Sequence, residues 1–180
     1  MKNALLYKVA PLCLVALGDL AYALATDVEQ PIEIEADFAE LDDQAGRTTY
    51  TGNVVVVQGT MRMTGEKLIA NFDENRQLVD VYLEGKPAYF KQTPDGGKQD
   101  IEGEGLQIEY HQKKSLLYLI DQASLKQGER LFEGYRINYD TERSIITGRG
   151  TDAGVQTASE GQPNRGRVKV IIPPKRKTAE

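Results

Sequence analysis

Hydrophobic and polar residues alternate along most of this chain. Leu106, Ile108 and Tyr110 alternate with Gln107 and Glu109, and the runs around 79–83 and 135–139 follow the same period of two. This period predicts β-strands with one face on a core and the other in water. Short turns rich in Gly, Asp and Pro separate the runs, which favours antiparallel hairpins. We therefore expect an all-β protein with roughly eight long strands between Ile32 and Gly148, or up to about sixteen if bulges divide them.

A short unit recurs along these strands. It has a polar start that contains a Glu, continues as an apolar alternation and ends at an aromatic residue or at an aromatic residue and an Asp, at 35–38, 65–73, 103–110 and 133–140. A repeat of this length predicts stacked units that bury one shared, elongated core, with a long apolar interior and two open ends. Such a body favours transport or scaffolding over catalysis. Glycines at the starts of the units, Gly65, Gly103 and Gly134, predict bends or bulges.

The first 25 residues have the features of a cleavable export signal. Lys2 and Lys8 give a positive start, the apolar stretch is too short to span a bilayer, and Ala23-Leu24-Ala25 is a cleavage motif. Export predicts a mature protein in a bacterial periplasm. We expect the following organisation: 1–25 signal peptide, 26–150 β domain, 151–164 polar loop, 165–173 terminal strand of the same domain, and 174–180 disordered tail.

Composition excludes several kinds of chemistry. The chain has 27 acidic and 22 basic residues, which argues against nucleic acid as a partner. Its one cysteine, Cys13, lies in the signal segment, so we expect neither a disulfide nor thiolate chemistry. The one histidine, His111, is expected to be exposed, and no metal or cofactor is expected. Glu102 and Glu104 share a strand face, which leaves a carbohydrate-active enzyme as one alternative.

The first predicted strand has the features of an unprotected sheet edge. Pro31 precedes Ile32-Glu33-Ile34-Glu35, and Pro173 follows the last strand. Soluble proteins usually block such edges. Either another segment covers this strand or it pairs with another chain by strand addition, and the pattern leaves both open.

Three motifs in order resemble one family. They are Gln30-Pro31-Ile32-Glu33-Ile34-Glu35-Ala36-Asp37, then Thr51-Gly52-Asn53-Val54-Val55-Val56-Val57-Gln58-Gly59, then Gly85-Lys86-Pro87-Ala88-Tyr89-Phe90. Together they resemble the OstA-like family over about residues 30–148. The resemblance implies a twisted, open β-jelly-roll that stacks head to tail. It also implies that the apolar interior carries lipopolysaccharide by its lipid A, between an inner-membrane LptC-like partner and an outer-membrane LptD-like partner.

The resemblance and the alternation together give a set of candidate residues. Those expected to line a lipid-binding groove are Ile32, Ile34, Phe38, Val54, Val56, Met61, Met63, Leu68, Phe72, Leu83, Phe90, Leu106, Ile108, Leu117, Leu119, Leu125 and Ile137. Those expected at a partner edge are Pro31, Ile32, Glu33, Ile34, Val168 and Val170. Most of the first set would be core in any β protein, and the phase is open at Val54–Val57. Phe90 is the best single candidate for a lining aromatic.

A covered groove solves a definite physical problem. Exposing one acyl chain of about a dozen carbons to water costs ~10 kcal/mol, at ~0.8 kcal/mol per CH₂. A carrier that keeps the chains covered needs no catalytic residue and no nucleotide. The main alternative is an adaptor that uses its edge strands alone, for which a polar interior would be expected.

Overall fold

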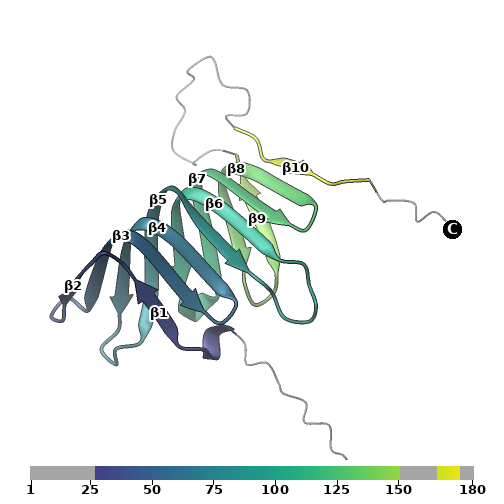
Figure 1. The fold of residues 1–180 in the computed structure, drawn as a ribbon. Helices are drawn as coiled ribbons and strands as arrows, with labels where there is room; N and C mark the ends of the chain where they lie inside the picture. Colours follow the sequence, from purple (N-terminus) through teal and green to yellow (C-terminus); the bar gives the residue numbers. More distant parts are fainter. Residues whose placement is uncertain (1–26, 151–165, 175–180) are drawn as a thin grey trace, which may run out of the picture.

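The computed structural model describes residues 27–150 and 166–174 and is built almost entirely of strands (Figure 1). The predicted signal peptide, the polar loop at 151–164 and the tail after Pro174 lie outside these residues. Within them, no helix is long and apolar enough to cross a membrane. The elements are η1 Asp27–Glu29, β1 Ile32–Glu35, β2 Phe38–Asp42, β3 Arg47–Gln58, β4 Met61–Phe72, β5 Leu78–Gln92, β6 Ile101–His111, η2 Gln112–Lys114, β7 Leu116–Gln127, β8 Arg130–Asp140, β9 Ile145–Arg149 and β10 Lys169–Ile171.

All the strands belong to one antiparallel sheet. Its main order is β1-β3-β4-β5-β6-β7-β8-β10, with β2 also paired to β3 and β9 also paired to β8. Each of the long strands β3 to β8 is interrupted once near its middle by a shift in pairing register, for example between Thr51 and Val54 and between Thr64 and Lys67. We call the row of these shifts the fold line, because the sheet bends over there into two layers.

The fold line divides the strands into two sets of eight segments. The first layer holds β2, 47–51, 67–72, 78–84, 107–111, 116–120, 136–140 and β9. The second layer holds β1, 54–58, 61–64, 88–92, 101–104, 123–127, 130–134 and β10. The long strands are β3 to β8, which is fewer than the eight expected. The bulges divide the sheet into two layers of eight segments, in agreement with the larger expected number of about sixteen. The terminal strand expected over 165–173 is shorter, with pairing at Lys169–Ile171.

Small residues allow the tight bends at the fold line. A Cβ on Gly65 would lie 2.6 Å from the carbonyl oxygen of Glu84, and one on Gly105 would lie 2.9 Å from that of Ile120. In β7 the bend uses Asp121 and Gln122, both with positive φ. The predicted bends at Gly65 and Gly134 lie at the register shifts. In β6 it is Gly105, and not the predicted Gly103, that meets the neighbouring backbone.

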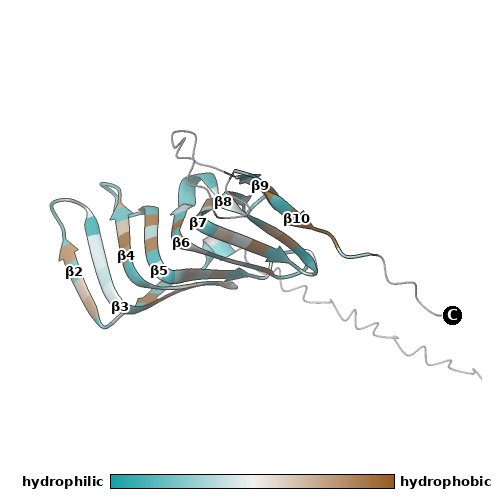
Figure 2. Ribbon diagram, turned by 90° about the horizontal axis from the view of Figure 1, so that it is seen from above, coloured by the Kyte–Doolittle hydropathy of each residue, from teal (hydrophilic) through white to brown (hydrophobic). Residues whose placement is uncertain are grey.

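The sequence repeat corresponds to every second strand. Its units begin beside the fold line and continue into β2 and into the first-layer halves of β4, β6 and β8. These segments all run in the same direction, from the fold line towards the free ends of the layer. One repeat is therefore one hairpin, and successive hairpins extend the same interior sideways. Figure 2 shows hydrophobic and hydrophilic residues alternating along the strands.

Candidate functional site

The space between the two layers is apolar and filled by the protein's own side chains. Of the predicted groove residues, twelve are buried: Val54, Val56, Met61, Met63, Leu68, Leu83, Phe90, Ile108, Leu117, Leu119, Leu125 and Ile137. Three more, Ile32, Ile34 and Phe72, are half-buried and pack against this core. The phase left open at Val54–Val57 is settled, since Val54 and Val56 face inward. The role of these residues in binding lipid stays a prediction.

The layers contact each other across the interior. The ring of Phe90, from the second layer, lies 6.1 Å from that of Tyr139, from the first, measured between centroids. Both side chains are fully buried. Any molecule that entered this interior would have to replace contacts of this kind, which would require the layers to separate.

Two predicted groove residues lie elsewhere. Phe38 pairs with Thr51, which pairs with Lys67. Paired residues have their side chains on the same face of a sheet, and Lys67 is on the outer face. Phe38 therefore also points outward, and it is 61% exposed. Leu106 lies in the register shift of β6, outside the regular alternation, and is only half-buried. In both cases the prediction is wrong because the chain changes phase at the fold line.

Opposite the fold line the free ends of the layers form a seam, which has a cavity of about 340 Å³ lined mostly by polar residues. Its second-layer wall includes Met61 and Gln92, and its first-layer wall includes Ser115, Thr141 and Ser144. Gln92 belongs to a row of three buried glutamines with Gln58 and Gln127, on the second-layer residues farthest from the fold line. These glutamines alternate along the row with the buried Met61 and Ile101, so the interior is apolar at the fold line and of mixed polarity at the seam.

Asp27 organises the second-layer edge of the seam. Its carboxylate accepts hydrogen bonds from the backbone N–H of Thr60 at 2.6 Å, the Thr60 hydroxyl at 2.8 Å and Gln92 Nε2 at 2.7 Å. The network thereby joins three segments: Asp27 precedes β1, Thr60 is in the β3–β4 turn, and Gln92 ends β5. This network fixes the orientation of the Gln92 amide.

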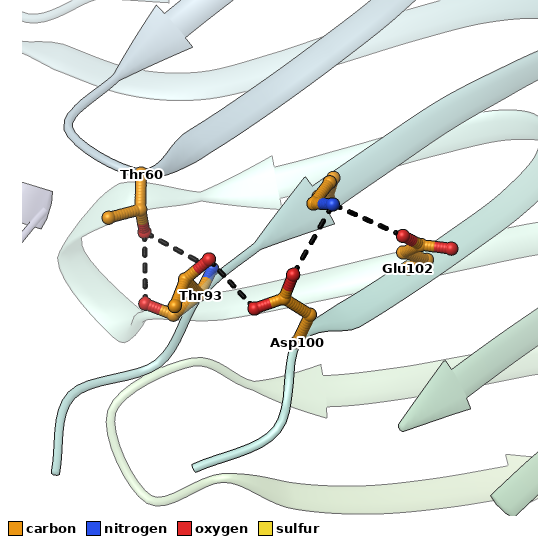
Figure 3. Close-up of polar contacts among 5 residues, drawn as sticks. Thr60, Thr93, Asp100 and Glu102 are labelled. Carbon is orange, nitrogen blue, oxygen red and sulfur yellow. Dashed lines mark hydrogen bonds and ion pairs between the residues drawn. The ribbon is translucent and has the colours of Figure 1, made fainter. Parts of the chain in front are cut away.

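A second network continues the same edge (Figure 3). Thr93 Oγ1 donates to Asp100 Oδ1 at 2.9 Å, and Lys91 Nζ lies 3.3 Å from both Asp100 and Glu102. Hydrogen bonds from Thr93 and Lys91 lower the pKa of Asp100, and those to Glu102 and Asp100 raise the pKa of Lys91. Lys91 and Asp100 are therefore charged at neutral pH and form part of a polar border along this edge.

Across the seam the polar connection is slight. The Lys98 ammonium, from the β5–β6 loop, donates to Ser144 Oγ, in the β8–β9 turn, at 3.0 Å, and this bond is exposed. An exposed hydrogen bond of this kind adds little to stability. The backbone holds the layers together at the fold line, and this bond is a weak link opposite to it.

The two ends of the sheet are unpaired among the described residues. At one end β1 and β2 pair only with β3, and at the other β9 and β10 pair only with β8. The exposed large hydrophobic side chains of the described chain all lie on these strands or directly follow one: Phe38, Leu41, Ile145, Val170, Ile171 and Ile172.

Among the predicted partner-edge residues, Ile32 and Ile34 turn inward, while Pro31 and Glu33 are exposed. Val170 is on the free edge and is 47% exposed. Val168 is half-buried, and its side chain lies against Gly148. Leu41 and Ile146 lie on the inner face of the two edges but are not among the predicted residues, because Phe38–Asp42 and Ile145–Arg149 have no regular alternation that fixes which side faces inward.

The polar residues considered for catalysis lie on the outer face. Glu102 pairs with Lys91 there, and Glu104 accepts a hydrogen bond from Ser124 at 3.4 Å. His111 is not exposed as expected: Nδ1 bonds to Asp80, and the ring lies between Tyr82 and Tyr118. These carboxylates do not face each other in a cleft, so this arrangement does not support glycoside hydrolysis.

Comparison with known proteins agrees with this architecture. Residues 33–145 match the family model described as LptA/(LptD N-terminal domain) LPS transport protein. The chain is 42% identical to the lipopolysaccharide export system protein LptH of Pseudomonas aeruginosa, over 90% of each chain. It is 36% identical to LptA of Escherichia coli K12, over 70% of this chain and 68% of that protein.

The fold is also that of a solved relative. The crystal structure of Pseudomonas aeruginosa LptH, described as the periplasmic component of the lipopolysaccharide transport device, has a TM-score of 0.73 and 39% identity, covering 83% of this chain and all of that one. These relatives are named as export-system proteins and not as enzymes, in agreement with the predicted non-catalytic role. The predicted OstA-like resemblance and jelly-roll fold are confirmed, and the chain belongs to the LptA/LptD N-terminal domain family of lipopolysaccharide transport proteins.

Proposed function

We propose that this chain is a periplasmic carrier that passes lipopolysaccharide towards the outer membrane, with the lipid A acyl chains between its two layers. The observation that carries the proposal is the continuous apolar interior, which reaches both unpaired ends of the sheet. The relatives' names supply the substrate, because they are lipopolysaccharide export proteins. The adaptor alternative, for which a polar interior was expected, has no such support.

Copies of the chain are proposed to stack head to tail through these ends. Strand directions support this in both layers. In the first layer, β9 of one copy and β2 of the next copy run in opposite directions. In the second layer, β10 of one copy and β1 of the next copy also run in opposite directions. A second copy can therefore extend both layers by antiparallel pairing, which gives the unpaired backbone groups their partners.

The rows of paired residues give the register of this junction. In the second layer the row that contains Phe90 begins at Ile34 and ends at Val170, so continuing it places Val170 beside Ile34 of the next copy. The neighbouring row, on the outer face, begins at Glu35 and ends at Lys169, so continuing it places Lys169 beside Glu35 of the next copy. In the first layer Ile146 meets Leu41. Apolar residues thus meet on the inner face, and opposite charges meet on the outer one.

The same edges are proposed to serve the partners at the two membranes. The family model covers both LptA and the N-terminal domain of LptD, so an outer-membrane LptD-like partner can offer a matching edge strand. An inner-membrane LptC-like protein is proposed at the opposite end of the stack. No energy source is needed in the chain itself, so direction has to come from the inner-membrane side.

Photo-crosslinking in living cells tests the carrier role. A photoreactive residue is placed at Phe90, and separately at Glu102, which pairs with Lys91 on the outer face beside Phe90. The two positions lie close together along the sheet but on opposite faces of it. We expect a lipopolysaccharide adduct at Phe90 and not at Glu102. Adducts at both, or at neither in a folded and exported protein, would refute the internal path.

A further inference from the structure

The inner face changes in polarity from the fold line to the seam. Beside the fold line the second layer has Gly65, Ala88 and Gly105, and the next row has Met63, Phe90 and Leu125. The row at the seam has the buried glutamines described above. In the first layer the row containing Tyr110 and Tyr139 lies on the seam side of the row of Leu83, Ile108 and Ile137. An amphiphile would meet apolar groups deep inside and polar groups at the opening.

Three buried polar atoms make no hydrogen bond of regular geometry among the described residues: Gln92 Oε1, whose residue lines the seam cavity, and the hydroxyls of Tyr110 and Tyr139. Tyr110 is 1% exposed and Tyr139 is fully buried. Buried polar groups in native proteins are nearly always hydrogen-bonded, and leaving one without a partner costs free energy. Removing these hydroxyls would not disturb the packing of the rings, so packing alone does not explain them.

Residues of the cavity wall interact with both tyrosine hydroxyls. Burial raises the pKa of Tyr110 to about 12, with the Asp27 charge adding to the rise and a weak hydrogen bond with the Thr141 side chain opposing it. Burial likewise raises the pKa of Tyr139 to about 12, and a weak hydrogen bond with the Ser144 side chain opposes that rise. Asp27, Thr141 and Ser144 all line the cavity. Both phenols therefore remain neutral hydrogen-bond donors at physiological pH.

We propose that Tyr110, Tyr139 and Gln92 form a binding site for the polar linkage that joins acyl chains to the head group of the lipid. This inference rests on the proposed function. A carbonyl oxygen of an amide or ester linkage accepts hydrogen bonds from the tyrosine hydroxyls. Gln92 Oε1 accepts one from the N–H of an amide linkage, and the bond from Gln92 Nε2 to Asp27 holds it in that orientation. The chains then point to the fold line, and the sugar leaves through the seam.

The test uses Tyr110→Phe, Tyr139→Phe and the double variant of the mature protein. The matched control is Tyr82→Phe, a half-buried tyrosine on the outer face. Binding of purified lipopolysaccharide is titrated beside binding of an apolar fluorescent dye, N-phenyl-1-naphthylamine. We expect each interior hydroxyl to contribute roughly three- to tenfold to lipopolysaccharide affinity, and dye binding and the control to be unchanged. Because the hydroxyls make no hydrogen bond of regular geometry in the lipid-free protein, its melting temperature is expected to be equal or higher in the variants.

Each other outcome has a definite meaning. Wild-type protein that binds lipopolysaccharide, with variants that bind it equally well, overturns the site but leaves the carrier role intact. An equal loss for dye and lipopolysaccharide, or a lower melting temperature in the variants, also overturns it, since the hydroxyls would then serve packing or folding. Wild-type protein that binds no lipopolysaccharide refutes the proposed function itself.

Discussion

Leu41 provides a quantitative test of the head-to-tail junction. It lies on the inner face of the free strand β2, is 67% exposed, and meets Ile146 of a neighbouring copy in the register derived above. Burying a whole leucine side chain stabilises by about 1.5–3 kcal/mol, so covering two thirds of it contributes about 1–2 kcal/mol. Leu41→Ala should therefore weaken self-association about fivefold to thirtyfold. Leu41→Asp should weaken it further, because the junction would bury an unpaired carboxylate.

Sedimentation velocity over a concentration series measures this effect on the mature protein. The matched control is Phe38→Ala, a large apolar residue on the outer face of the same strand, for which we expect less than about a threefold change because that face stays in water. Both side chains are exposed in the free protein, so neither variant should alter the thermal midpoint. Unchanged association of Leu41→Asp, or a larger effect at Phe38 than at Leu41, would show that the two copies do not join in this register.

Three further predictions concern the interior and the seam. Phe90→Ala should lower the free energy of unfolding by about 3–5 kcal/mol and weaken lipopolysaccharide binding, whereas Glu102→Lys, on the outer face, should change neither in denaturant melts and titrations. Lys98→Cys combined with Ser144→Cys and joined by a short bismaleimide should block lipopolysaccharide loading, whereas the unlinked double variant should load normally; normal loading of the linked protein would contradict opening at the seam. Since the pKa of Tyr110 and Tyr139 is raised from 10 to about 12, the folded protein disfavours their ionised forms. Stability is therefore unaffected by these groups below pH 10 and falls as pH rises from 10 towards 12, by up to about 3 kcal/mol each; Tyr110→Phe and Tyr139→Phe should flatten this alkaline loss in pH-dependent urea melts.

The alternation of residues was enough to predict the strands and most of the interior. Within one layer the inward residues follow a strict period of two, as at Met61 and Met63 or at Leu117 and Leu119. In a sheet with one face in water, such apolar side chains are stable only on the face that packs against the core. The repeat also had a physical basis, because each unit is a hairpin that begins beside the fold line.

The fold line itself explains the errors. In β4 the inward residues change from odd numbers, at Met63, to even numbers, at Leu68. One extra residue in a strand reverses the face of every residue beyond it. The same change between β1 and β2 moves the inward series from Ile34 to Leu41, which leaves Phe38 outside. No local feature of the sequence fixes how many residues a bend uses, so these positions required the structure.

The polar groups at the seam were missed for a different reason. Tyr110 and Tyr139 continue an apolar alternation and lie at or next to the ends of repeat units, which predicts burial of the rings but nothing about the hydroxyls. Whether a buried hydroxyl has a partner depends on segments distant in sequence, here the β8–β9 turn and Asp27. Contacts between segments distant in sequence leave no regular pattern of residues, whereas the rows of the interior do.

An interior that is full in the absence of lipid suits a carrier that must also release its load. Exposing an acyl chain to water costs ~10 kcal/mol, whereas replacing contacts such as Phe90–Tyr139 with contacts to the chain exchanges one apolar surface for another. The net change is small because close-packed apolar contacts are similar in strength. In the proposed stack, the first copy would close on its own side chains as the second opened to receive an acyl chain. The free energies of successive copies would then differ little, so lipid would move along the stack without a trap, and any net flow would have to be imposed at its ends.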